Sequence, residues 1–185
     1  MRDWSLHLLD LMENSLRAEA TRLDLSLVLS QDGALDIILR DDGFGMEKDF
    51  ASTATDPFTT TRTTRKVGLG LSLAQHNAEL TGGYLELLSE PGCGTRVHLC
   101  ILTSHIDCLP LGDLAQTMVS LILLNHDKAE FTLDLSSPLG SEHFSTKVIK
   151  QVLGDEVALA EPEVLNYLKE LLHEQSQTVF GGILL

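Results

Sequence analysis

The stretch LDLSLVLSQDGALDIILRDDGFGM, residues 23–46, predicts two paired strands followed by a glycine-rich turn. In residues 23–30 and again in 35–40, apolar side chains recur at every second position, which is the period of half-buried strands. The QDG between the two runs is typical of a hairpin. Asp41 stands where the second strand ends and can present its carboxylate to a buried donor. An ordinary Asp-Gly β-turn is the alternative, and a calcium loop is excluded because its alternating Asp and Asn ligands are missing.

Elements on both sides of this stretch complete an α-β-β-loop-α-β-β order. Residues 4–18 and 69–80 are predicted helices, and residues 84–89 and 95–102 form a second predicted hairpin. The polar connection over residues 41–67 is more typical of a functional loop than of a linker. The order predicts an α+β fold, a two-layer α/β sandwich with helices on one face of the sheet.

Two polar residues of the first helix form a candidate metal and catalytic pair. Asp10 and Asn14 lie four residues apart and therefore on one helix face. A carboxylate and an amide oxygen together can hold a hydrated Mg²⁺ and orient a water molecule. A solvated helix face is the alternative reading of the same pair.

The segment TTRTTRKVGLGLSL, residues 60–73, is a candidate anion site. It holds Arg62, Arg65 and Lys66, followed by glycines that open a helix, where backbone N–H groups and the helix dipole favour negative charge. The segment is neither a dinucleotide fingerprint, because Leu73 stands where a glycine is needed, nor a Walker A loop. A loop that simply enters a helix is the alternative.

Four segments in order resemble the nucleotide-binding domain of gyrase B, Hsp90-type chaperones, sensor histidine kinases and MutL, the GHKL or Bergerat-fold ATPases. They are HLLDLMENSLRA (7–18), DDGFGM (41–46), DPFTTTRTTRKVGLGLSLAQ (56–75) and PGCGTRVHL (91–99), so the resemblance spans residues 4–102. The short lid and the PFTTTR…GLGLSL pattern are most similar to the histidine-kinase and anti-sigma-factor kinase branch. The implied cofactors are ATP and Mg²⁺.

The resemblance also implies a role for each matching residue. Asn14 would coordinate Mg²⁺, Asp41 would accept a hydrogen bond from the adenine amino group, and Thr95 would contact the base through water. The remaining implied contacts are with the base (Gly43, Gly45 and Met46) and with the phosphates through the lid and its end (Arg62, Arg65, Lys66, Gly68, Leu69, Gly70 and Leu71).

Two departures from the family pattern bear on activity. Asp42 replaces the Asn that usually follows the adenine-binding Asp, which adds a negative charge. The position of the general base, four residues before Asn14, holds Asp10 rather than Glu. Glu13 is adjacent to Asn14 but points about 100° away from it on a helix. We therefore assign the base to Asp10 and expect hydrolysis to be slow or absent.

Charge separates the chain into two predicted parts, residues 1–103 and 104–185. The net charge is −14; the second part carries 4 Lys, no Arg and 12 Asp and Glu, which argues against nucleic-acid binding. This extension of unknown role is predicted to contain a helix (112–125), a strand (129–135), a helix beginning at Ser141 and a last helix beginning at Pro162. It could pack on the first sheet or form a partner-binding module, and the apolar run 118–124 predicts burial in the core or in a homodimer interface.

The remaining histidines, cysteines and apolar runs do not indicate a further site. Four potential zinc ligands lie close together in the chain, but their spacing matches no standard zinc site: His98, Cys100, His105 and Cys108. The chain begins within the metal-binding helix, and His7 is a poor phosphoacceptor candidate, so we expect any substrate to be another protein. No apolar run reaches the length of a membrane span. The three cysteines lack the spacing of a disulfide framework, which is expected of a cytoplasmic protein.

The function expected from the sequence is a regulatory protein kinase that uses Mg·ATP to phosphorylate a partner protein. Two alternatives remain open. One is a nucleotide-sensing binding module that changes its partner affinity with the bound nucleotide. The other is a slow ATPase whose lid drives dimerisation.

Overall fold

The computed structural model describes residues 1–54, 69–154 and 158–182, and these form a layer of helices against one sheet. The elements, in chain order, are α1 (Trp4–Arg17), β1 (Arg22–Leu29), β2 (Ala34–Asp41), α2 (Lys48–Thr53), α3 (Leu69–Leu80), β3 (Tyr84–Glu90), β4 (Gly94–Leu102), α4 (Leu114–Asn125), β5 (Glu130–Ser137), β6 (Gly140–Ser145), α5 (Thr146–Leu153) and α6 (Pro162–Phe180).

The strands form a single six-stranded sheet in the order β3-β4-β2-β1-β5-β6. All neighbours are antiparallel except β1 and β5, which run parallel. The two predicted hairpins are present, and β2 joins them by pairing with β4. This mixed α/β architecture confirms the predicted fold class.

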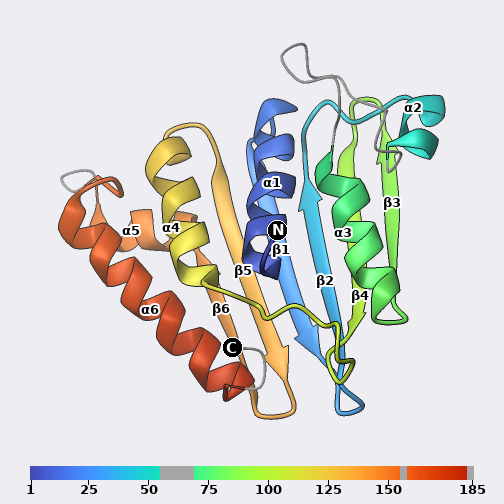
Figure 1. Cartoon of the computed structure of the whole chain (residues 1–185). Coiled ribbons are helices and arrows are strands. Elements are labelled where there is room, and N and C mark those ends of the chain that lie inside the picture. The colour runs from blue at the N-terminus through green and yellow to red at the C-terminus, as the bar shows by residue number, and fades with distance from the viewer. Residues whose placement is uncertain (55–68, 155–157, 183–185) are drawn as a thin grey trace.

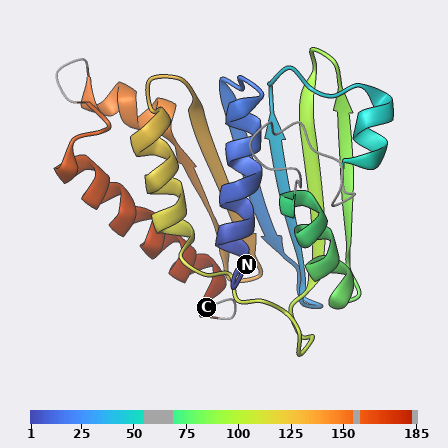
Figure 2. The same cartoon turned by 45° about the horizontal axis from the view of Figure 1, so that its top comes forward.

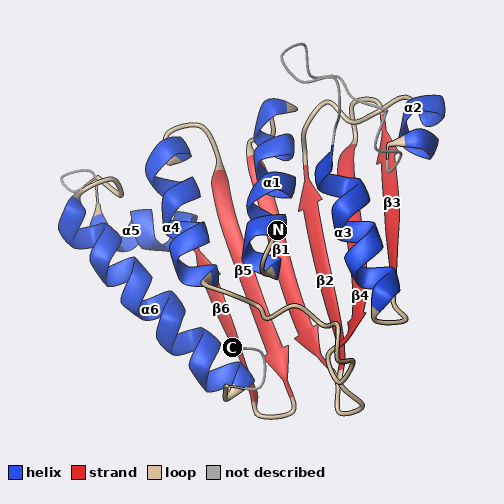
Figure 3. Cartoon of the chain, in the orientation of Figure 1, coloured by secondary structure: helices blue, strands red, loops and turns tan. Residues whose placement is uncertain are grey.

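Helices α1, α3, α4 and α6 cover one face of the sheet, as Figures 1 and 2 show from two directions. The alternation read from the sequence decides which face is covered, because Leu23, Leu25 and Leu27 of β1 are buried while the residues between them are not. Figure 3 shows the resulting separation into a helix layer and a strand layer. The uncovered face carries the polar and charged residues of the same strands.

Helix α1 lies over the middle of the sheet because its apolar stripe fits the space between α3 and α4. Asp3 caps its first turn by accepting from the backbone N–H of Leu6 at 2.9 Å. Trp4, Leu8 and Met12 are buried on the sheet side. The Asp10–Asn14 face of α1 turns toward Gly70, in the first turn of α3.

The extension over residues 104–185 continues the sheet of the first part. β5 pairs with β1 over its length, and the backbone N–H of Glu130 donates to the carbonyl of Thr21 at 2.9 Å. The backbone N–H groups of Trp4 and Ser5 donate to the carbonyls of Pro110 and Leu111, which ties α1 to the connection before α4. Of the two arrangements left open by the sequence, the extension packs on the first sheet. The boundary at residue 103 stays a prediction.

Two elements differ from the sequence prediction. Residues 140–145 form the strand β6, so the helix expected to begin at Ser141 begins at Thr146 instead. Phe144, Val148 and Val152 are spaced as on a helix, but Phe144 is buried on the strand and the two valines are exposed on α5. Helix α2 was also missed, inside the stretch predicted as a loop. Both errors concern elements of six to eight residues, which are too short for periodicity to identify.

The apolar run of α4 lies largely in the core, since Met118, Val119, Leu121 and Ile122 are buried. Leu123 and Leu124, at its end, are exposed. In the part of the chain that the structure describes, no helix combines the length and hydrophobicity that crossing a membrane requires.

Candidate functional site

A cavity of about 250 Å³ opens where the ends of β2, β3 and β4 meet α1, α2 and the start of α3. Seven of the residues singled out from the sequence line it, although they come from segments more than 80 residues apart: Asn14, Asp41, Gly45, Met46, Gly70, Leu71 and Thr95. The topology brings them together because β4 lies beside β2, with Thr95 directly opposite Asp41.

Asp41 is held by donors from three elements. Its Oδ2 accepts from the Ser15 hydroxyl of α1 at 2.6 Å, and its Oδ1 accepts from the backbone N–H groups of Gly43 at 3.0 Å and Thr95 at 3.2 Å. The Thr95 hydroxyl also lies 2.9 Å from that of Ser89 on β3. A carboxylate fixed in this way keeps lone pairs in a defined direction, so it can select a ligand that offers an N–H group.

The glycine turn after β2 owes its two glycines to the protein's own packing. A Cβ on Gly45, whose φ is +68°, would lie 2.0 Å from the carbonyl oxygen of Glu90. A Cβ on Gly43 would lie 2.7 Å from the carbonyl oxygen of Ala18. The turn is thus wedged between the end of α1 and the β3–β4 hairpin. Gly45 lines the cavity, whereas the described contacts of Gly43 are with α1 and Asp41.

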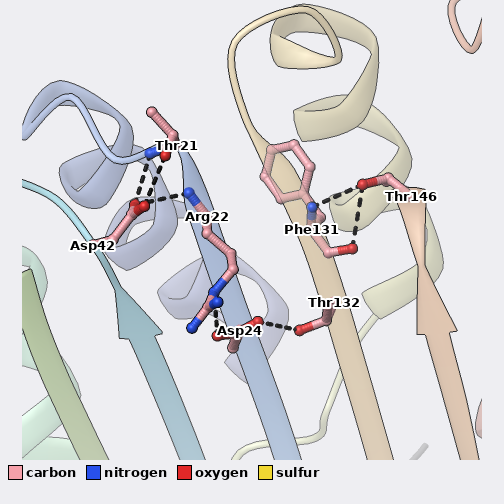
Figure 4. Close-up of polar contacts among 7 residues, drawn as sticks. All are labelled: Thr21, Arg22, Asp24, Asp42, Phe131, Thr132 and Thr146. Carbon is pink, nitrogen blue, oxygen red and sulfur yellow. Dashed lines mark hydrogen bonds and ion pairs between the residues drawn. The ribbon is translucent and has the colours of Figure 1, made fainter. Parts of the chain in front are cut away.

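Asp42, the departure from the family pattern, points away from the cavity and ties the turn to β1. Its carboxylate accepts from the backbone N–H and hydroxyl of Thr21, both at 2.7 Å, and from the backbone N–H of Arg22 at 2.8 Å (Figure 4). Partial burial raises the pKa of Asp42, but the hydrogen bonds from Thr21 and Arg22 outweigh it and hold that pKa below its usual value. The extra charge is therefore met by protein donors.

Asn14 faces the cavity together with a cation that sequence reasoning missed. Arg17 donates from Nη1 to Oδ1 of Asn14 at 2.9 Å and from Nη2 to Glu13 at 2.5 Å, and it lines the cavity. Its position three residues after Asn14, on the same helix face, was the signal available in the sequence.

Asp10 lies against the first turn of α3. A Cβ on Gly70 would be 1.8 Å from Oδ2 of Asp10, so the glycine is needed for the two helices to approach. Leu71 lines the cavity, and the backbone of Leu69 begins α3. Nδ2 of Asn14 would be 3.8 Å from the same Cβ on Gly70, so both side chains lie beside the N-terminal turn of α3.

Apolar side chains that were not predicted form much of the wall. Phe44 lies in the glycine turn, Phe50 comes from α2 and Ala54 follows it, and Leu87 and Val97 come from β3 and β4. Phe50 and Ala54 are four residues apart, which is the one sequence signal that α2 offered. Arg62, Arg65, Lys66 and Gly68 lie outside the described residues.

His7 is part of the seam between α1 and α3 and not of the cavity surface. Its Nε2 lies 3.0 Å from Nδ2 of Asn77 on α3, and its ring contacts that of Trp4. Burial, followed by the charge of the N-terminus, lowers the pKa of His7 to about 4. A buried neutral imidazole in this position has a packing role.

Comparisons with known proteins agree with the resemblance read from the motifs. Residues 5–105 match the family described as histidine kinase-, DNA gyrase B-, and HSP90-like ATPase. The C4-dicarboxylate transport sensor protein DctB of Pseudomonas aeruginosa is 37% identical over 97 residues, which are 49% of this chain and 16% of that protein. The chain therefore spans a small part of this relative's length. Because the family match covers more than half of the chain, the protein belongs to the histidine kinase-, DNA gyrase B- and HSP90-like ATPases, and this membership implies that it binds ATP.

Proposed function

We propose that the chain binds Mg·ATP in the cavity beside α1 and acts as a regulatory protein kinase that phosphorylates a partner protein. The observation that carries the binding part is Asp41, whose two oxygens are fixed by Ser15, Gly43 and Thr95 at the cavity wall. A fixed acceptor among apolar walls suits an adenine ring, which offers an amino group at its edge and two apolar faces.

The residues at the other end of the cavity fit a metal-bound triphosphate. Asn14 offers an amide oxygen of the kind that Mg²⁺ accepts, and the cationic Arg17 lies beside it. Since Oδ1 of Asn14 accepts from Arg17, we expect the guanidinium to turn from Asn14 toward phosphate oxygens when a metal is held there. Mg·ATP would supply the phosphoryl group, and the chain's part is to orient it and to accept a proton.

Asp10 is the proposed acceptor of that proton, taken from the hydroxyl of the partner protein. It lies one turn before Asn14 and beside Gly70, at the helix terminus where the resemblance puts the phosphates. The description of the relative as a sensor protein supports a signalling role. The region shared with this relative is 16% of its length.

A nucleotide-sensing module that hardly turns over, or a slow ATPase, is the second candidate function. The observation in its favour is that Asp10 packs against the backbone of Gly70 and does not line the cavity. A carboxylate held in this way would activate a nucleophile less effectively than one that faces the ligand.

Labelled ATP separates these functions. We expect wild type to transfer label from the γ-phosphate to a protein in an extract of its own organism, and Asp10→Asn to bind ATP normally while transfer falls. Asp41→Ala, which should not bind ATP, is the negative control. Equal transfer by wild type and Asp10→Asn would remove Asp10 as the base. Tight ATP binding with neither transfer nor phosphate release would favour the sensing module.

A further inference from the structure

The uncovered face of the sheet carries two arginines side by side. Arg40 of β2 and Arg96 of β4 are directly opposite each other in the antiparallel pairing. Both alternate with buried residues, since Leu39 and Val97 point to the helix layer. Like charges at directly opposite positions of a sheet repel each other, so this pair lowers the stability of the folded chain.

Two acidic groups near the arginines, Asp24 and Asp36, are engaged with other partners. Asp24, which is opposite Arg40 on β1, accepts from Nε of Arg22 at 3.0 Å and from the hydroxyl of Thr132 at 2.6 Å (Figure 4). Asp36, on the same face, lies 2.7 Å from Nε2 of His98. Within residues 1–54, 69–154 and 158–182, neither Arg40 nor Arg96 has an ion pair within 4.0 Å. The chain has a net charge of −14, and yet these two adjacent cations make no ion pair with its described residues.

A hollow of about 250 Å³ lies beside the arginine pair; it shares Asp41 and Thr95 with the nucleotide cavity but none of that cavity's apolar wall residues. Leu88 of β3, opposite Arg96 and 61% exposed, lines it together with Cys93 of the β3–β4 turn. Glu90 also lines the hollow and would repel an anion from its rim, which restricts an anionic group to the arginine side. The hollow therefore combines two guanidinium groups with an exposed apolar side chain.

We propose that Arg40, Arg96 and Leu88 form a docking site for an acidic segment of a partner protein. One or more carboxylates of the segment bridge the two guanidinium groups, and a neighbouring apolar side chain rests on Leu88. Charge complementarity supports this occupant: guanidinium groups bind carboxylates in bidentate fashion, and an added anion also reduces the repulsion between the two cations. A peptide fits better than a small anion because β3 is an edge strand that also exposes Tyr84 on the Leu88 face, along which a chain can lie. The site requires no phosphoryl transfer, so it stands independently of the proposed function.

The test uses the full chain and a fluorescein-labelled peptide rich in Glu with regularly spaced Leu, followed by anisotropy in low salt. We expect binding that weakens as salt is added and that weakens about tenfold in Arg96→Ala and about as much in Arg40→Ala. Lys147→Ala, which removes an exposed cation from α5, is the matched control and should bind as wild type. The peptide should also protect Cys93, which is exposed, from iodoacetamide in wild type but not in Arg96→Ala.

Thermal unfolding keeps the result interpretable, because removal of one of two opposed cations should leave Tm unchanged or raise it. Absence of peptide binding to wild type, or equal binding by wild type and the double variant, overturns the proposal. Equal binding of a peptide with Gln in place of Glu also overturns it. If citrate binds as tightly as the peptide with the same dependence on the two arginines, the site takes small anions, and the partner assignment is wrong.

Discussion

The two halves of the sheet share one helix layer but differ in what fills the space between helices and strands. Under α1 and α3, polar side chains meet around a cavity at the strand ends, as Ser15 does with Asp41. Under α4 and α6, the same space is filled by Phe131, Leu133 and Leu168, all fully buried. A helix layer that opens over strand ends leaves room for a ligand, whereas one closed over the strands contributes stability. Substitutions in the α4–α6 half should therefore lower stability more than ATP affinity, and substitutions around the cavity should do the reverse.

The largest effect is expected in the extension, from Phe131→Ala. The side chain is fully buried on β5, so its removal should lower the free energy of unfolding by about 3–5 kcal/mol. The folded fraction should bind ATP as wild type does. Urea unfolding and calorimetry measure the two quantities. Val152→Ala, 79% exposed in the same half, is the control and should change stability by less than about 0.5 kcal/mol. A lower intrinsic ATP affinity in Phe131→Ala would show that the halves are coupled.

The next effect belongs to the cavity half. Asp41→Ala should weaken ATP binding by about a hundredfold or more, because it removes a charged acceptor and frees the donors that hold it. Calorimetric titration with Mg·ATP checks this. Asp134→Ala removes a carboxylate from β5, where the partner is the exposed His143, and should leave the ATP affinity unchanged. Wild-type affinity in Asp41→Ala would contradict the assignment of the cavity to adenine.

The sequence indicated the cavity half better than the extension, and the reason is physical. Asp41, Asn14 and Gly70 carry constraints that are local, such as a strand end, a helix face and a close helix approach, so their residue types show in the sequence. The strand β6 has only Phe144 and Ser145 buried, and its pairing with β5 depends on contacts that no local pattern records. Two consecutive buried residues show no period of two, so periodicity cannot distinguish this strand from a helix turn.

Within the site, the sequence identified Asp41, Asn14 and Thr95 but missed Arg17 and most of the apolar wall. Phe50, Leu87 and Val97 look like ordinary core residues, and only the fold shows that they border a cavity. Asp42 illustrates the converse, because its type suggested an extra charge near the ligand. Its actual contacts with Thr21 and Arg22 depend on how the glycine turn crosses the start of β1. Partners that are distant in sequence decide where a side chain points.

A smaller effect should follow from the contact between α1 and α3. In Gly70→Ala the new Cβ would lie 1.8 Å from Oδ2 of Asp10, so the carboxylate or the helix must move. We expect phosphate release or transfer to fall about tenfold while ATP affinity changes less. The displaced carboxylate of Asp10 acts in the reaction and does not bind the adenine. Gly140→Ala, in the extension, meets nothing within 4 Å and is the matched control. Unchanged turnover in Gly70→Ala would mean that Asp10 has no catalytic role.

The smallest effect concerns the pH dependence of stability and again separates the halves. Burial, with a contribution from the N-terminal charge, lowers the pKa of His7 from 6.5 to about 4 in the folded chain. Between these values the unfolded chain binds a proton that the folded chain does not, so stability falls as the pH falls from about 6.5 toward 4. Above about pH 6.5 the full contribution of the neutral imidazole is present. The charges of Asp3 and Asp10 favour the protonated imidazole, and the pKa of about 4 already includes their effect. His7→Gln keeps a polar partner for Asn77 and should flatten the urea-unfolding profile over this range, whereas His143→Gln on the exposed β6 should not. Parallel profiles for wild type and His7→Gln would show that the imidazole becomes protonated without disrupting the contact between α1 and α3. Water would then reach His7 more easily than its 1% exposure indicates.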